Sequence, residues 1–277
     1  METIKFKSDY FNIVDTLFCG QVFRFKPFKK GFLITSKNES CYLYENLGYF
    51  YLESEHADYF YNYFDLDKDY EKINSEILNY NDEFLTKIAS LGKGIRILKQ
   101  DLLETAISFI ISQNNNVKRI QLILENLSKK AGERYEFMGE EYYAFPTLTE
   151  MKNLSVKDFK DLGLGYRSEY LYEFIKKLSS GYDLERLKSL DTQNLTSELL
   201  KIKGIGKKVA DCITFFGYGR TDSFPVDTWI EKIYVENFKG TEKDRVKISK
   251  NLVEKFGKLS GYVQQYAFYY KRSLEKK

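Results

Sequence analysis

This chain of 277 residues has few residues of the kinds that bind metals, form disulfide frameworks or anchor a protein in a membrane. His56 is its one histidine, and the three cysteines, Cys19, Cys41 and Cys212, lack metal-ligand spacing. Their odd number argues against a disulfide framework, and a cysteine-ligated iron–sulfur cluster normally needs four cysteines. No apolar run is long enough to cross a bilayer, and the first residues lack the apolar centre of a signal peptide. We therefore expect a cytoplasmic protein with reduced cysteines.

Charge is distributed unevenly along the chain. Residues 1–94 carry 11 Lys+Arg against 15 Asp+Glu, a net charge of −4. Residues 95–277 carry the remaining 32 Lys+Arg and 25 Asp+Glu, a net charge of +7. A basic segment favours a polyanionic partner, although a solvated surface of mixed charge explains the same balance.

The first 94 residues have the pattern of short strands. Segments rich in aromatic and β-branched residues alternate with the turn signals KPFKKG, KNES and NLG. The expected strands are QVFRF, GFLITS, CYLYEN and YFYLES. This pattern predicts a domain over 1–94 that is built on an antiparallel sheet.

The periodicity becomes helical from about residue 95. Asp101 precedes an apolar run as a helix N-cap, and Glu104 completes a capping-box pattern. Further helices are predicted over 117–127, 168–178, 192–202, 207–217, 227–237, 243–256 and from about 261. The expected fold class is therefore α+β, with a helical region over 95–277 packed against the sheet as one body.

The stretch LLKIKGIGKKVADC, residues 199–212, joins two predicted helices through a hairpin that contains Gly204 and Gly206. Backbone N–H groups at such a hairpin suit phosphate oxygens, and glycine lets a nucleic-acid backbone approach closely. An ordinary corner between helices, with solvated lysines, is an equally good interpretation of the hairpin alone. Lys207 and Lys208 point about 100° apart on the second helix, so one of them can face a cleft.

Asp227, in the segment FPVDTW, follows this helix. An aspartate near an amine nucleophile can relay protons and stabilise positive charge on a sugar. A lysine at a helix N-terminus is disfavoured as a cation, which favours the neutral, nucleophilic amine. Asp227 is also a good N-cap for the helix that follows, and the two roles are compatible.

Seven segments in register resemble the 8-oxoguanine DNA glycosylase/lyases of the helix–hairpin–helix superfamily. They are LFCGQVFRF at 17–25, GIRILKQD at 94–101, SFIISQNNNVKRI at 108–120, LGLGYR at 162–167, KVADC at 208–212, PVD at 225–227 and GYVQQYAF at 261–268. The resemblance implies an N-terminal antiparallel sheet domain on a helical glycosylase body. It implies that Lys208 attacks C1′ of the damaged nucleotide, and that Asp227 assists base loss and imine chemistry. Lys207, beside the hairpin glycines, would contact the DNA backbone.

The resemblance also implies a pocket for a base flipped out of the duplex. The Gly20 carbonyl would accept the N7–H that 8-oxoguanine has and guanine lacks, since guanine would leave that carbonyl unpaired. Cys212 and Phe268 would sandwich the base, and Gln264 would read its Watson–Crick edge. Without the resemblance, core packing explains Cys212 and Phe268, and a simple turn explains Gly20.

Four residues are implied at the duplex. Asn114 would fill the hole left by the base, and Tyr166 would wedge beside it. Arg119 and Arg167 would contact the orphaned cytosine, whose O2 and N3 accept from an arginine fork. Taken alone, the QNNN run is a polar turn and Arg119 a surface residue. Where animal members commonly have histidine after PVD, this chain has Thr228-Trp229, so no phosphate contact from a histidine is expected.

The sequence thus predicts a monomeric enzyme that excises 8-oxoguanine opposite cytosine from double-stranded DNA and nicks the strand, without metal or organic cofactor. Two other functions stay open. One is a glycosylase of the same fold for alkylated or other purines, which the lysine and Gly20 disfavour. The other is a DNA-binding protein without catalysis, which explains the basic segment but not the pocket residues.

Overall fold

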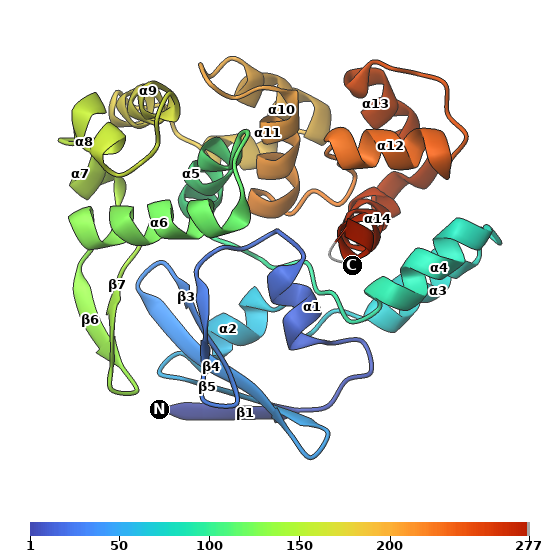
Figure 1. Cartoon of the computed structure of the whole chain (residues 1–277), viewed down its shortest axis with the longest axis horizontal. Helices are drawn as coiled ribbons and strands as arrows, with labels where there is room; N and C mark the ends of the chain where they lie inside the picture. The colour runs from blue at the N-terminus through green and yellow to red at the C-terminus, as the bar shows by residue number, and fades with distance from the viewer. Residues whose placement is uncertain (276–277) are drawn as a thin grey trace.

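An antiparallel sheet packs against a larger helical body in the computed structural model, which describes residues 1–275 (Figure 1). The α+β prediction is therefore confirmed. The sheet has five strands in the order β1-β5-β4-β3-β2, and every neighbouring pair is antiparallel. The strands are β1 (Glu2–Phe6), β2 (Phe25–Phe28), β3 (Gly31–Ser36), β4 (Glu39–Asn46) and β5 (Tyr49–Ser54).

The strand expected over 21–25 is displaced toward the C-terminus. It begins at Phe25, so Pro27 lies within β2. Proline lacks a backbone N–H, and this is tolerated because β2 is an edge strand of the sheet. Gln21 explains why the preceding residues leave the sheet. Its buried amide donates to Arg96 O at 2.7 Å and accepts from Leu98 N at 3.0 Å, which ties the segment to the chain that enters the helical body.

Helices occupy more of the first 94 residues than the strand pattern indicated. They are α1 (Ile13–Phe18), α2 (Ala57–Tyr63), α3 (Tyr70–Leu78) and α4 (Glu83–Gly92). Helix α2 closes the core of the sheet through Phe60 and Tyr63. Helices α3 and α4 instead join the core of the helical body, and α4 packs on the last helix of the chain. The expected boundary at residue 94 stays a prediction.

The rest of the described chain is mostly helical, as expected, with one small hairpin of strands. Its elements are α5 (Leu102–Ser112), α6 (Val117–Ala131), β6 (Arg134–Phe137), β7 (Glu140–Tyr143), α7 (Leu148–Met151), α8 (Val156–Asp161), α9 (Arg167–Ser179), η1 (Glu185–Ser189), α10 (Thr192–Leu200), α11 (Lys207–Cys212), η2 (Ile213–Gly217), α12 (Thr228–Glu236), α13 (Arg245–Phe256), η3 (Gly257–Leu259) and α14 (Ser260–Glu275). Helix α14 lies near the middle of the molecule, between α4 and α12 (Figure 1).

The cap of α5 shows how the two parts are joined. Asp101 accepts a hydrogen bond from Glu104 N at 2.9 Å, as a capping residue should. The expected capping box also needs the Glu104 carboxylate to accept from the backbone N–H of Asp101, and this part of the prediction is wrong. The Glu104 carboxylate turns toward the sheet instead. There it accepts from Lys37 N at 3.0 Å and from Arg24 at 3.4 Å. Burial raises the pKa of Glu104, and the Arg24 charge opposes that rise.

Candidate active site

The hairpin between α10 and α11 has the geometry that the two glycines predict. Gly204 has φ +88°, and a Cβ there would lie 2.4 Å from Tyr170 Cγ, so both the backbone and the packing require glycine. Gly206 is the N-cap of α11 and brings no capping side chain. Gln113 donates to Gly204 O at 2.9 Å and thereby fastens the hairpin to the turn between α5 and α6.

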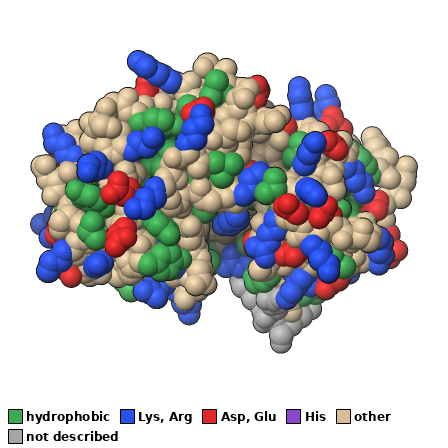
Figure 2. All heavy atoms as spheres, turned by 90° about the horizontal axis from the view of Figure 1, so that it is seen from above, with side chains coloured by type: hydrophobic (Ala, Val, Ile, Leu, Met, Phe, Trp, Pro, Cys, Tyr) green, Lys and Arg blue, Asp and Glu red, His purple; other side chains and the backbone are tan. Residues whose placement is uncertain are grey.

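A cavity of about 770 Å³ opens beside this hairpin. Its walls come from the α1–β2 loop, the α5–α6 turn, the starts of α11 and α12, α13 and α14. Seen from above, the molecule is hollowed between two lobes, and Lys and Arg side chains gather in the hollow (Figure 2). The cavity brings together eight of the residues expected at the site: Gly20, Asn114, Tyr166, Gly206, Lys207, Lys208, Asp227 and Phe268.

The two adjacent lysines of α11 differ in their partners. Lys207 forms an ion pair of 2.5 Å with Asp211, one turn further along the helix. Burial raises the pKa of the Asp211 carboxyl to about 6, against the opposing charge of Lys207. Lys208 has no carboxylate partner among the side chains of residues 1–274, and its ammonium lies 5.2 Å from the centre of the Phe109 ring. Lys208 is therefore the lysine that remains available to a ligand in the cavity.

Asp227 combines the two roles considered for it. Its Oδ1 accepts from Trp229 N at 3.0 Å and Ile230 N at 2.9 Å, so it caps α12. Both bonds use the same oxygen, and within the described residues Oδ2 accepts no hydrogen bond. The half-buried carboxylate lines the cavity that Lys208 also lines. The capping bonds hold the carboxylate in place while one oxygen stays free for chemistry.

The residues expected to hold a flipped base lie at two depths. Gly20 and Phe268 line the cavity, and Gly20 has φ +91° with its open side toward the Phe268 ring. Cys212 and Gln264 are buried behind the lining. Gln264 donates to Pro225 O at 3.3 Å, while its side-chain oxygen has no partner within residues 1–275. Burial raises the pKa of the Cys212 thiol to about 11 despite Lys208 nearby, so it stays protonated at neutral pH.

The four residues expected at the duplex are not equivalent. Asn114 has φ +45° and, with Tyr166, lines the cavity; the Tyr166 side chain is 52% exposed. Arg119 is exposed and donates to Gly163 O at 3.1 Å. Arg167 is buried beneath the α5–α6 turn, where its guanidinium donates to backbone carbonyls. That it also contacts the opposite base stays a prediction.

The sequence reading missed several residues that line the same cavity: Phe23, Phe109, Arg245 and Arg272. Arg272 follows Phe268 by four residues, a helical spacing that could have placed both on one face of α14. The sequence also gives no role to Trp229, which follows PVD-Thr. Its ring packs on Phe268 with centroids 5.3 Å apart, so it supports the wall of the cavity.

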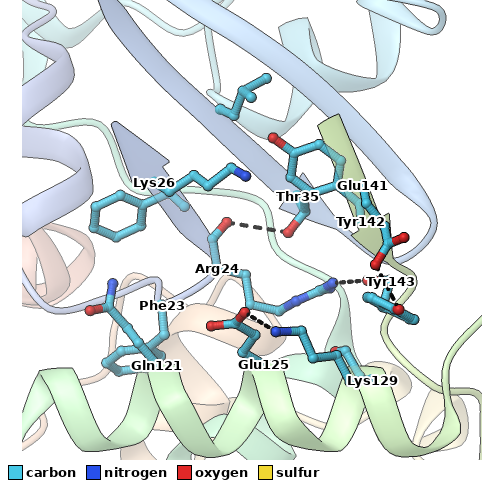
Figure 3. A pocket seen from close by; sticks show the side chains of 13 residues that line it. Phe23, Arg24, Lys26, Thr35, Gln121, Glu125, Lys129, Glu141, Tyr142 and Tyr143 are labelled. Atoms are coloured by element: carbon cyan, nitrogen blue, oxygen red, sulfur yellow. Dashed lines mark hydrogen bonds and ion pairs between the residues drawn. The ribbon is translucent and has the colours of Figure 1, made fainter. Parts of the chain in front are cut away.

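A second, smaller cavity of about 160 Å³ lies between β2, β3, α6 and β7 (Figure 3). The Glu125–Lys129 ion pair of α6 forms one wall, and Arg24 reaches across to the carbonyl of Tyr143. None of the residues expected at the site line this space. We therefore expect the chemistry in the larger cavity.

Within residues 1–275, no helix is both long and apolar enough to span a bilayer.

Comparison with known families identifies the family of the chain. The model of the 8-oxoguanine DNA glycosylase N-terminal domain matches residues 3–106. The model of the HhH-GPD superfamily of base excision DNA repair proteins matches residues 107–258, which include the hairpin, Lys208 and Asp227. The chain belongs to the HhH-GPD superfamily of base excision DNA repair proteins, in the branch that carries the 8-oxoguanine DNA glycosylase N-terminal domain.

Three individual proteins are similar to this chain in sequence or structure. A probable N-glycosylase/DNA lyase of Methanothermobacter thermautotrophicus is 31% identical over 211 residues, 69% of this chain and 68% of that protein. The Clostridium acetobutylicum 8-oxoguanine glycosylase/lyase, solved with DNA containing cytosine opposite 8-oxoguanine, is 35% identical with a TM-score of 0.91. That match covers 96% of this chain and 93% of the other. The Archaeoglobus fulgidus 3-methyladenine DNA glycosylase, 18% identical with a TM-score of 0.79 over 99% of each chain, shares the fold alone.

Proposed function

We propose that this protein removes 8-oxoguanine from double-stranded DNA and nicks the strand through an imine formed on Lys208. One observation carries the proposal: of two adjacent lysines at the cavity, Lys207 is paired with Asp211, whereas Lys208 faces the cavity that Asp227 also lines. The protein is a bifunctional DNA glycosylase and abasic-site lyase of base excision repair, like the relatives that share both of its parts.

The reaction follows from the amine and the carboxylate. The Lys208 amine bonds to C1′ while the C1′–N9 bond breaks and leaves its electron pair on the base. Asp227 stabilises the positive charge that develops on the sugar, and it accepts and returns protons as the ring opens to the imine. Loss of a C2′ proton then expels the 3′ phosphate, which nicks the strand 3′ to the lesion. The lysine supplies the nucleophile, so this reaction needs no metal or organic cofactor.

Selectivity rests on the base pocket. The Gly20 carbonyl accepts the N7–H of 8-oxoguanine, and guanine, with a lone pair at N7, leaves that carbonyl unpaired. The unpartnered oxygen of Gln264 suits a donor on the Watson–Crick edge of the base. Phe268, supported by Trp229, stacks on one face of the base, and Cys212 lies on the other.

Recognition of the duplex uses the rim of the cavity. Asn114, held at positive φ on the α5–α6 turn, enters the hole left by the base, and the exposed Tyr166 wedges beside it. Arg119, with its exposed guanidinium, contacts the cytosine opposite. Arg167 has four of its five N–H donors on backbone carbonyls, so at most one Nη1 hydrogen is left for the cytosine. The hairpin glycines and Lys207 lie against phosphates, and the protein acts as a monomer.

Two other functions predict different behaviour. A glycosylase for alkylated purines shares the fold but would use water, so it would release 3-methyladenine and form no imine. A DNA-binding protein without catalysis would bind undamaged duplex as tightly as damaged duplex, with strong salt dependence.

Borohydride trapping on a duplex with one 8-oxoguanine opposite cytosine tests the proposal. The wild-type protein should form a covalent adduct with the damaged duplex and none with undamaged DNA. Lys208→Gln should form no adduct. Lys207→Gln, its neighbour on the same helix, should form the full amount at saturating DNA, because only Lys208 supplies the amine. Alkali-labile sites without an adduct would instead mean a water-using glycosylase.

A further inference from the structure

Arg272 lines the cavity but has no role in the reaction proposed above. It lies on α14 one turn beyond Phe268 and lines the same cavity as Lys208. Its Nη1 is 3.2 Å from the point where a Cβ of Gly20 would stand, and Phe268 Cε1 is 3.3 Å from that point. The guanidinium therefore lies beside the glycine whose carbonyl is expected to face N7–H of the lesion.

The Arg272 guanidinium has no protein partner in the described part of the chain. Among the side chains of residues 1–274, it has no hydrogen-bond or ion-pair partner, whereas Arg245 on the same cavity is paired with Glu231 at 2.8 Å. Arg272 is only partly exposed, and burial lowers its pKa while leaving the guanidinium charged. A partly buried cation without a partner needs an acceptor, which a ligand in the cavity can supply.

The chemistry of the lesion offers acceptors at this point. On 8-oxoguanine the N7–H donor lies between two carbonyl oxygens, at C6 and C8. A wall that presents one acceptor, the Gly20 carbonyl, and one adjacent donor, the Arg272 guanidinium, complements this edge. The base also leaves with the electron pair of the C1′–N9 bond, which is delocalised onto its carbonyl oxygens. A fixed cation beside these oxygens interacts more strongly with the departing, negatively charged base than with the base still bonded to the sugar.

We propose that Arg272 donates a hydrogen bond to a carbonyl oxygen that flanks N7–H of the flipped base, and thereby promotes base release. The proposal rests on the proposed function and adds a residue to its base pocket. A duplex with a preformed abasic site distinguishes a contact with the base from a contact with a phosphate. Such a site keeps its phosphates and has lost the base.

The test compares two steps in Arg272→Met, at saturating enzyme and in single turnover. Excision of 8-oxoguanine opposite cytosine should slow by about tenfold to a hundredfold, as for loss of one charge-assisted hydrogen bond. Nicking of a duplex with a preformed abasic site should stay within about twofold of wild type, which also shows that the variant is folded. Arg272→Lys, which keeps the positive charge and can still donate, should recover part of the excision rate.

Lys271→Met is the matched control, because it removes the same charge from the neighbouring residue of α14, whose partner is Glu236 outside the cavity. Both of its rates should match wild type. Equal slowing of excision and nicking by Arg272→Met would overturn the proposal in favour of a phosphate contact or a structural role. Unchanged excision would overturn it as well. If wild-type protein neither excises 8-oxoguanine nor nicks abasic DNA, the proposed function fails instead.

Discussion

Replacing Arg167 by methionine removes the clamp on the turn between α5 and α6. The guanidinium donates to Gln113 O through Nε at 2.6 Å and also through Nη2, to Asn114 O at 2.6 Å, and to Leu164 O at 3.3 Å. Methionine fills a similar length but donates nothing, so all three carbonyls lose the guanidinium in a region where Arg167 is 4% exposed. Leu164 O keeps the backbone N–H of residue 167 and Gln113 O keeps the Tyr166 hydroxyl, whereas Asn114 O keeps no donor from this cluster. Asn114 would then lose part of what holds its positive φ.

The expected loss of stability follows from the burial of these bonds. A hydrogen bond to a charged group contributes about 1.5–3 kcal/mol when buried, and neighbouring bonds on one group are not additive. We expect Arg167→Met to lower the free energy of unfolding by about 3 kcal/mol. At about 2 °C per kcal/mol for a chain of this size, the midpoint of thermal unfolding falls by about 6 °C.

Urea unfolding followed by circular dichroism measures this change, with Arg119→Met as the matched control. Arg119 also donates to a backbone carbonyl, but it is exposed and makes one such bond, to Gly163 at 3.1 Å. Its replacement should cost less than about 1 kcal/mol. If the two variants unfold within about 1 kcal/mol of each other, the clamp assigned to Arg167 is wrong.

Two further changes test other parts of the site. Burial raises the pKa of Asp211 to about 6, so the native state keeps this proton to higher pH than the unfolded chain and loses stability as pH rises between about 4 and 6. The unfolding free energy of wild type minus that of Asp211→Asn should therefore fall by about 2 kcal/mol between pH 4 and pH 7, and a flat difference would contradict the raised pKa. Gly20→Ala places a Cβ against Arg272 and Phe268 at φ +91°. It should cost about 2 kcal/mol in stability and slow excision, while an intact excision rate would show that the pocket tolerates the methyl group.

Local signals explain why some elements were predictable from the sequence alone. Gly204 is a turn glycine because its backbone has a positive φ, and Asp227 is a helix cap because its carboxylate satisfies free N–H groups; both are properties of a few adjacent residues. Patterning likewise predicted the strands GFLITS, CYLYEN and YFYLES, which are β3, β4 and β5. The missed strand β1 has only two apolar residues, Ile4 and Phe6, and neither is fully buried, so its apolar signal is short.

By itself, then, the sequence determined the α+β fold class and the hairpin, because those depend on short-range periodicity and on the residues of one turn. Its motifs, through the family resemblance, predicted Lys208 and Asp227 as the reactive pair. Only the tertiary structure decided how the remaining charges are used. Arg167 is turned inward as a clamp on carbonyls 53 and 54 positions earlier in the chain. Arg272 reaches Gly20 across 252 positions of chain. Such pairings depend on which surfaces packing brings together, and no local pattern encodes them.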